Sequence, residues 1–175
     1  GTLGDLETEK EPFIAEVPQQ FQPLQSFTEN CINQIGKRGL LILGEQGGYI
    51  YPDIIGEYSS SNPTDADGIN LEPLKVPYWH YNKEPNTGKN IAFASLQPKL
   101  YARDDPSLSI EAQLARFLNE KIDSCLDNYN AFIPQGFTTK MGVKETEVHF
   151  CENTFNFLLK MQLEAQKGEA RQTME

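Results

Sequence analysis

The chain contains 175 residues with 15 basic and 25 acidic side chains, a formal net charge of -10, and 38% hydrophobic residues. A chain of this length can bury the core of one ordinary domain. Its negative charge argues against nucleic acid as a partner, because the average field repels phosphate backbones, and no apolar run reaches the roughly eighteen residues that a membrane-spanning helix needs.

The two ends of the chain are more polar than its middle. Residues 1–23 carry five acidic residues, one lysine and three prolines, a composition typical of a flexible acidic leader or linker. Residues 164–175 show neither strand alternation nor a helical apolar stripe, and we expect a flexible tail there. These limits leave a single folded domain over residues 24–163.

A first helix is predicted over residues 26–43. Ser26 and Glu29 have the spacing of a capping box, in which each side chain reaches the orphan backbone N–H of the other residue. Apolar residues then recur at helical spacing to the end of this span. Gly36 and Gly39 lie inside it, where each one costs about 1 kcal/mol relative to alanine or marks the close approach of another element.

Regular elements are sparse between this helix and the next one. Tyr49–Tyr51 has the pattern of a short strand, and residues 52–75 are rich in Gly, Ser, Asn, Asp and Pro without a periodic apolar pattern. A loop of that length needs a purpose or a packing partner. A strand is predicted over residues 76–82, followed by an irregular stretch to Asp105 with at most one short strand near Ile91.

The predicted strand 76–82, VPYWHYN, contains the only tryptophan of the chain. Alternation places Tyr78 and His80 on one face, and Trp79 and Tyr81 on the other. These four residues are a candidate binding surface, because Trp and Tyr can stack on sugars or anchor a protein partner. The alternative, which the alternating pattern favours, is an aromatic strand that packs against a helix.

The second half of the chain has the clearest patterns. Ser109 is the predicted N-cap of a helix that continues to Leu126 with one continuous apolar stripe. Three short strands separated by two turns follow, at 137–140, 145–150 and 155–163, with the turns at 141–142 and 152–153. This order predicts an α+β fold, in which two helices pack on one face of an antiparallel sheet with a C-terminal three-stranded meander.

His149 and Cys151 are the one pair of side chains that could carry thiol chemistry. They are two residues apart in a predicted strand and therefore share a face. A thiol beside an imidazole can act as a cysteine nucleophile with its base, and the same two groups can be metal ligands. No third ligand and no cysteine-enzyme signature accompanies them, so we expect no catalytic residue and no cofactor.

The acidic loop offers a weak calcium candidate formed by Asp65, Asp67, Asn70 and Glu72. Carboxylate and amide oxygens around a glycine turn are the ligands that calcium prefers. Their spacing fails the EF-hand pattern, because the first and twelfth loop positions would be Pro63 and Leu74. An ordinary solvated turn is the favoured interpretation, and we expect no metal site.

Cys31 and Cys125 each lie on the apolar stripe of a predicted helix. Two helices side by side on one sheet could bring them within bonding distance, and a bridge closing so long a loop is worth at most about 4–5 kcal/mol in the chain-entropy model. Two unpaired buried thiols would behave as small hydrophobic side chains. Spacing alone leaves both interpretations open, and the third cysteine, Cys151, has no predicted bonding partner.

Seven motifs in this order give the chain a resemblance to known sequences. They are FTENC at 27–31, GEQGGYI at 44–50, NPTDADGI at 62–69, VPYWHY at 76–81, SIE at 109–111, DSCL at 123–126 and QGF at 135–137. Over about residues 24–166 the chain resembles a family of uncharacterised archaeal proteins. Those proteins begin with a single hydrophobic segment behind a short basic, pilin-signal-like stretch, and the remainder faces outward.

The resemblance implies a soluble ectodomain that is normally held on the extracellular face of the cell membrane by an N-terminal anchor. Cys31 and Cys125 match the two helix cysteines of the family, which implies a disulfide and fits an oxidising exterior. The chain departs from the family at residues 83–97, where further cysteines are expected and none is present. The family has no activity that can be transferred to this chain.

The expected function is therefore that of a non-enzymatic extracellular domain of a membrane-tethered archaeal surface protein. It would act in cell-surface interaction or assembly, with a pilin-like role included, and its partner would be a protein, a cell surface or further copies of itself. One alternative is a small-ligand or glycan-binding module that uses the aromatic strand 76–82. A thiol-dependent enzyme is the third.

Overall fold

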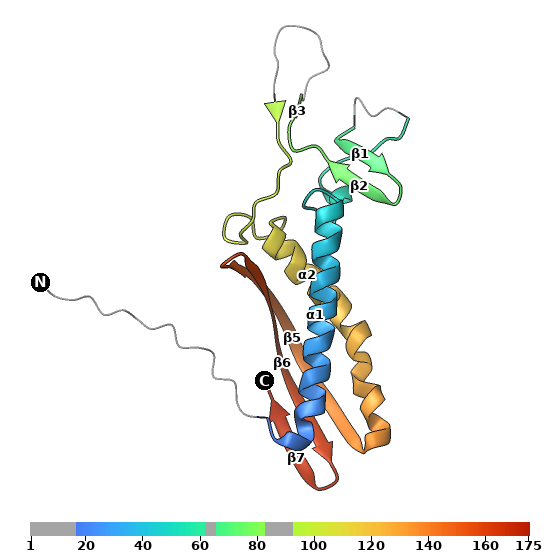
Figure 1. Ribbon diagram of the computed structural model, residues 1–175, viewed down its shortest axis with the longest axis vertical. Coiled ribbons are helices and arrows are strands. Elements are labelled where there is room, and N and C mark those ends of the chain that lie inside the picture. Colours follow the sequence, from blue (N-terminus) through green and yellow to red (C-terminus); the bar gives the residue numbers. More distant parts are fainter. Residues whose placement is uncertain (1–16, 62–65, 83–92) are drawn as a thin grey trace, which may run out of the picture.

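The computed structural model of the protein describes residues 17–61, 66–82 and 93–175. Two α-helices, α1 (Gln22–Glu45) and α2 (Ile110–Leu126), lie side by side on one face of a three-stranded antiparallel sheet (Figure 1). The sheet strands are β5 (Phe137–Cys151), β6 (Thr154–Lys167) and β7 (Ala170–Met174). This arrangement confirms the predicted α+β fold class.

Four short strands form a separate head beyond the far end of α1 (Figure 1). They pair as two antiparallel hairpins, β1 (Gly68–Leu71) with β2 (Leu74–Pro77) and β3 (Tyr81–Asn82) with β4 (Phe93–Ala94). Three 3-10 helices complete the described elements: η1 (Gln19–Phe21), η2 (Pro52–Ile54) and η3 (Asp127–Gln135).

Helix α1 begins four residues earlier than predicted, and the capping box is wrong. The helix starts at Gln22 directly after η1, with Pro23 in its first turn and no side-chain cap. Proline is well suited there, because the first turn has no intrahelical partner for its N–H groups. Phe21 and Leu24 are fully buried, so the core holds this turn. Residues 17–23 of the expected leader thus belong to the fold, and residues 1–16 lie outside the described residues.

The C-terminus of α1 ends in a glycine turn. Gly47 has a φ of 63°, and the Gly48 N–H donates to the Leu43 carbonyl at 2.7 Å, which is the hydrogen bond of a Schellman motif. The strand predicted at Tyr49–Tyr51 is wrong. That segment runs without a strand partner, and the Ile50 N–H is bound by the side chain of Gln113 instead, at 2.8 Å.

The two glycines inside α1 mark close approaches, as one of the two interpretations predicted. A Cβ atom on Gly36 would lie 2.9 Å from the ring of Phe157 on β6. A Cβ atom on Gly39 would lie 2.9 Å from Leu114 on α2. Glycine therefore lets α1 pack closely on both the sheet and the second helix.

Helix α2 agrees with its prediction. The Ser109 side chain accepts a hydrogen bond from the Ala112 N–H at 3.1 Å, and the helix ends at Leu126. Its buried stripe joins the inner face of the sheet and α1 in one main hydrophobic core, which includes Leu118, Ile122 and Leu126, all at 0% exposure.

The three-stranded meander exists, but its strands differ from the prediction. Strand β5 runs through the turn predicted at Met141–Gly142, where the structure has an irregularity between Met141 and Lys144 instead. The turn at Glu152–Asn153 is confirmed, and both residues have positive φ, 50° and 62°, as the two-residue turns of tight hairpins require.

The flexible tail predicted at residues 164–175 is wrong. These residues form the end of β6, a turn at Gly168–Glu169 and strand β7. Ala170 and Met174 on β7 pack against the main core. The alternation is short and uses small or polar residues, so the sequence alone gave little signal.

Two further predictions fail in the head. The stretch 52–75, expected to be irregular, contains η2, β1 and the first half of β2. The aromatic stretch 76–82 is not one strand, because β2 ends at Pro77 and the chain bends through Tyr78–His80 before β3.

Candidate functional site

The two helix cysteines form a disulfide, as the resemblance implied. Cys31 on α1 and Cys125 on α2 are bonded, with their Cα atoms 5.8 Å apart and 94 positions apart in the sequence. Cys31 is buried in the main core. The bond therefore fixes the two helices to each other at the interface where they also pack. Cys151 is a free, exposed thiol at the end of β5.

The glycine turn after α1 is the point where head and body join. The buried side chain of Gln46 donates to the Tyr49 carbonyl at 3.0 Å and accepts from the Lys75 N–H on β2 at 3.3 Å. The indole N–H of Trp79 donates to the Gly47 carbonyl at 2.8 Å. A Cβ atom on Gly48 would lie 2.6 Å from Pro98. The run GEQGG therefore holds three segments of the head close to its backbone.

Two buried polar residues on the first turns of α2 bind backbone groups. Gln113 is 1% exposed; its amide donates to the carbonyls of Gly48 and Leu108 and accepts from the Ile50 N–H. Glu111 accepts from the Ala102 N–H and from the Phe150 N–H on β5, both at 2.8 Å. Sequence reasoning missed both residues, since a helix stripe does not distinguish a buried polar residue from an exposed one.

The four aromatic-stretch residues do not alternate across the two faces of one strand. Tyr78 is half-buried and its N–H donates to the Asp67 carbonyl at 2.9 Å. Trp79 is 44% exposed while its indole N–H is bound to the Gly47 turn. His80 is exposed. The backbone of Tyr81 pairs with Ala94, and its side chain lies outside the described part of the chain. The bend thus replaces the two-faced strand of the prediction.

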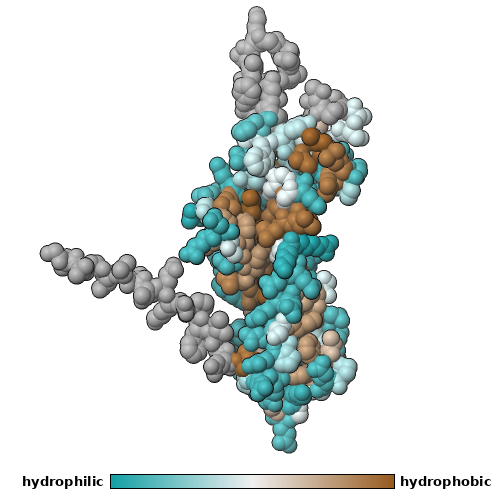
Figure 2. Space-filling model, viewed as in Figure 1, coloured by the Kyte–Doolittle hydropathy of each residue, from teal (hydrophilic) through white to brown (hydrophobic). Residues whose placement is uncertain are grey.

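An exposed apolar patch covers the head hairpin. It comprises Ile69 and Leu71 on β1, which are 43% and 57% exposed, while Ile54 on η2 is a separate exposed apolar residue of the head, at 56%. Ile69 and Leu71 share a face of β1, because side chains alternate along a strand. Figure 2 shows hydrophobic residues gathered at this end of the molecule. We call Ile69 and Leu71 the head patch. The alternating apolar residues on either side of Glu72-Pro73 are the sequence signal for this hairpin, which the irregular loop predicted over 52–75 misses.

The calcium candidates are used in local contacts where the structure describes them. The Asp67 carboxylate accepts from the Glu57 N–H at 2.8 Å, and the Asn70 amide donates to Glu72 at 3.1 Å. Asp65 lies outside the described residues. No group of three or more His, Cys, Asp or Glu side chains among the described residues is arranged to hold a metal ion.

The exposed face of the large sheet carries a small ionic cluster. Glu147 accepts from Lys160 at 2.6 Å and lies 3.0 Å from the ring Nε2 of His149. The hydrogen bond from Lys160, followed by that from His149, lowers the pKa of the Glu147 carboxyl, and Glu147 raises the pKa of Lys160. The imidazole that sequence reasoning paired with Cys151 therefore has a carboxylate partner.

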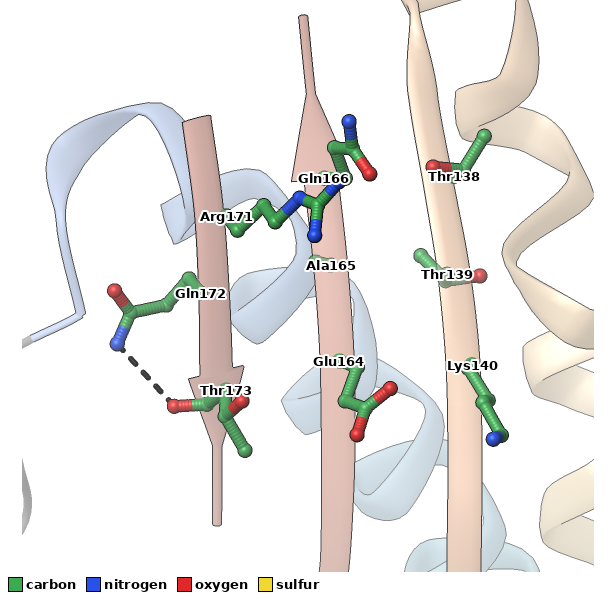
Figure 3. Close-up of a pocket in the computed structure, with 9 residues that line it drawn as sticks. All are labelled: Thr138, Thr139, Lys140, Glu164, Ala165, Gln166, Arg171, Gln172 and Thr173. Atoms are coloured by element: carbon green, nitrogen blue, oxygen red, sulfur yellow. Dashed lines mark hydrogen bonds between the residues drawn. The ribbon is translucent and has the colours of Figure 1, made fainter. Parts of the chain in front are cut away.

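A shallow hollow lies on this same face where all three strands run together (Figure 3). Its volume is about 460 Å³, and polar side chains from β5, β6 and β7 line it, among them Lys140, Glu164 and Arg171. Lys140 and Glu164 stand directly opposite each other on β5 and β6. Because the lining carries both positive and negative side chains, the hollow is neither uniformly basic nor uniformly acidic.

Comparison with known proteins identifies no relative: no family model, no curated protein and no solved structure matches the chain. Neither helix in the described part of the chain is long and apolar enough to cross a membrane.

Proposed function

We propose that this chain is the extracellular interaction domain of a membrane-tethered archaeal surface protein and that it has no catalytic role. The observation that carries the proposal is the Cys31–Cys125 disulfide. Structural disulfides form and persist in oxidising environments and are rare where thiols are kept reduced. The resemblance to anchored archaeal surface proteins, which rests on the sequence motifs, implies the same location for these two cysteines.

The position of the head patch supports an interaction role. Val17, the first described residue, and the end of β7 border one pocket, which is lined by Val17, Met174 and Glu175 among others. The head lies at the opposite end of the molecule (Figure 1). A tether that precedes Val17 would thus hold the patch far from the membrane. Contiguous exposed apolar side chains are typical of protein interaction sites.

The buried polar side chains and the exposed histidine that could have taken part in catalysis are engaged in structural hydrogen bonds. Gln113 and Glu111 are hydrogen-bonded to backbone groups, and His149 is bound to Glu147 on an exposed sheet face. The glycan-binding alternative has less support, because the polar edge of Trp79 is already bound to Gly47.

The extracellular location is tested by labelling Cys151 on intact cells of the source organism with a membrane-impermeant PEG-maleimide. Because Cys151 is free and exposed and the other two cysteines are bonded, we expect a single adduct per chain on a non-reducing denaturing gel. The Cys151→Ser variant is the matched control and should show no adduct. Labelling only after the cells are permeabilised would contradict the proposal.

The interaction role is tested with the fluorescently labelled domain and intact cells of the same organism. We expect saturable binding that weakens about tenfold or more in the double variant Ile69→Ser, Leu71→Ser, since central apolar contacts dominate binding energy. Val143→Ser is the control, because Val143 is 93% exposed on β5, away from the head. Equal binding by the patch variant and the control would contradict a role for the head patch.

A further inference from the structure

One edge of the large sheet is covered by another element, and part of the other edge has no strand partner among the described residues. On the β5 edge, α2 binds the strand: Glu111 accepts from the backbone N–H of Phe150, and the side-chain hydroxyl of Thr146 donates to the Ala115 carbonyl, both at 2.8 Å. At the opposite edge of the sheet, β7 pairs with β6 only over residues 163–167 of β6. Residues 154–162 of β6 thus have a strand neighbour on one side only among the described residues.

Backbone hydrogen-bonding groups point out of this second edge. The two-residue turn after Cys151 makes Cys151 and Thr154 a hydrogen-bonded pair, and in an antiparallel ladder the next pair is not hydrogen-bonded. The Phe150 N–H agrees with this alternation, because it points away from β6 and donates to Glu111. On β6 the N–H and C=O groups of Phe155, Phe157 and Leu159 therefore point away from β5. We call residues 155–162 the open edge.

The open edge lacks the features that normally protect an exposed strand. Its sequence, FNFLLKMQ, has one charged residue, Lys160, and no proline or glycine. Edge strands that must stay unpaired usually carry charges, prolines or bulges. Among the described residues, β7 is the one strand that pairs with β6 on this side, and the pairing stops at Leu163. In Figure 2 hydrophobic residues are visible between α1 and the sheet.

We propose that the open edge binds the open edge of a second copy of this chain. The two β6 strands would run antiparallel about a two-fold axis at Leu158 and join the two sheets into one sheet of six strands. Both inner faces then lie on the same side, so the half-buried Phe155, Phe157 and Leu159 of the two copies form one apolar layer under the helices.

Charge complementarity favours a second copy over an unrelated strand. In this register Lys160 stands opposite Asn156 of the second copy, and no two like charges face each other. The flank of α1 at this edge carries exposed Glu29, Asn33 and Lys37 at one-turn intervals, and Glu29 borders the pocket that contains Leu159 and Met161. Two antiparallel α1 helices would bring Glu29 of each copy toward Lys37 of the other.

This pairing rests on the assembly role in the proposed function and names a second copy of the chain as the partner. Its test uses the purified chain, so its result does not depend on the extracellular location or on binding by the head patch. Strands of this length bury less than about 1,000 Å², which is the range of weak complexes. Tethering to a shared membrane raises the effective concentration, which makes weak pairing sufficient.

The test is sedimentation of the purified 175-residue chain from about 10 μM to about 1 mM, the range in which weak dimers form. We expect a monomer–dimer equilibrium whose dissociation constant rises about tenfold or more in Leu158→Lys, because the axis would then place two lysines opposite each other. Val143→Lys adds the same charge to the exposed bulge of β5 and should dimerise like the wild type. Thermal unfolding of both variants checks that they fold.

Hydrogen exchange identifies the interface. The amides of Phe157 and Leu159 should exchange more slowly as the protein concentration rises, and this protection should disappear in Leu158→Lys. A chain that stays monomeric throughout the range would overturn the proposal. So would a dimer that survives Leu158→Lys unchanged, that requires Cys151 and disappears in Cys151→Ser, or that is lost in Leu71→Ser on the head patch.

Discussion

Loss of the Cys31–Cys125 disulfide is expected to lower the unfolding free energy by about 2–4 kcal/mol in the double variant Cys31→Ala, Cys125→Ala. The bond joins residues 94 positions apart, so its removal gives the unfolded chain much conformational freedom. Urea denaturation followed by circular dichroism measures the change. The loss of packing adds to it, because Cys31 is buried between the helices.

Cys151→Ala is the matched control for this prediction. Cys151 is exposed and unbonded, and a surface substitution of this kind changes stability by about 0.5 kcal/mol at most. Wild-type protein treated with a reductant should approach the stability of the double variant. If the double variant unfolded at the same urea concentration as Cys151→Ala, the bond would have no part in stabilising the fold.

Gln113→Leu is expected to have an effect of similar size, about 3 kcal/mol or more. The substitution keeps the volume of the side chain but leaves three backbone groups without their partner, those of Gly48, Ile50 and Leu108. A buried backbone group without a hydrogen bond costs about 1–3 kcal/mol. Urea denaturation measures the total, and hydrogen exchange at the Ile50 amide reports the local effect.

Gln34→Leu makes the same chemical change at an exposed position of α1 and should be nearly neutral. The Ile50 amide should exchange much faster in Gln113→Leu than in Gln34→Leu. If the two variants had equal stability and equal exchange at Ile50, the hydrogen bonds of Gln113 would not connect the head to α2.

The parts of the fold that follow a local pattern were predictable. The stripe of α2 and its cap at Ser109 depend on residues close together in the sequence, and so does the turn at Glu152–Asn153. The start of α1 was missed because a tertiary contact decides it: Phe21 and Leu24 are buried against the core. Strand β7 was missed because β6 supplies its hydrogen-bond partners.

The candidate site was less predictable than the fold. The bend at Trp79 depends on the Gly47 carbonyl, which is 32 positions away in the sequence, and no pattern within 76–82 indicates it. Ile69 and Leu71 were visible as alternating apolar residues, but alternation does not show that this face of the hairpin is exposed. The open edge follows from the length of β7 relative to β6, which only the register shows.

The position of the disulfide also determines what happens to the protein when its backbone is cut. Cys31 and Cys125 enclose the whole head, from η2 to β4, in one covalent ring. A protease that cleaves any single peptide bond between them produces two polypeptides that remain one molecule. The core elements on either side, α1 and α2, keep their bond and their packing, so a chain nicked in the head would separate only after reduction.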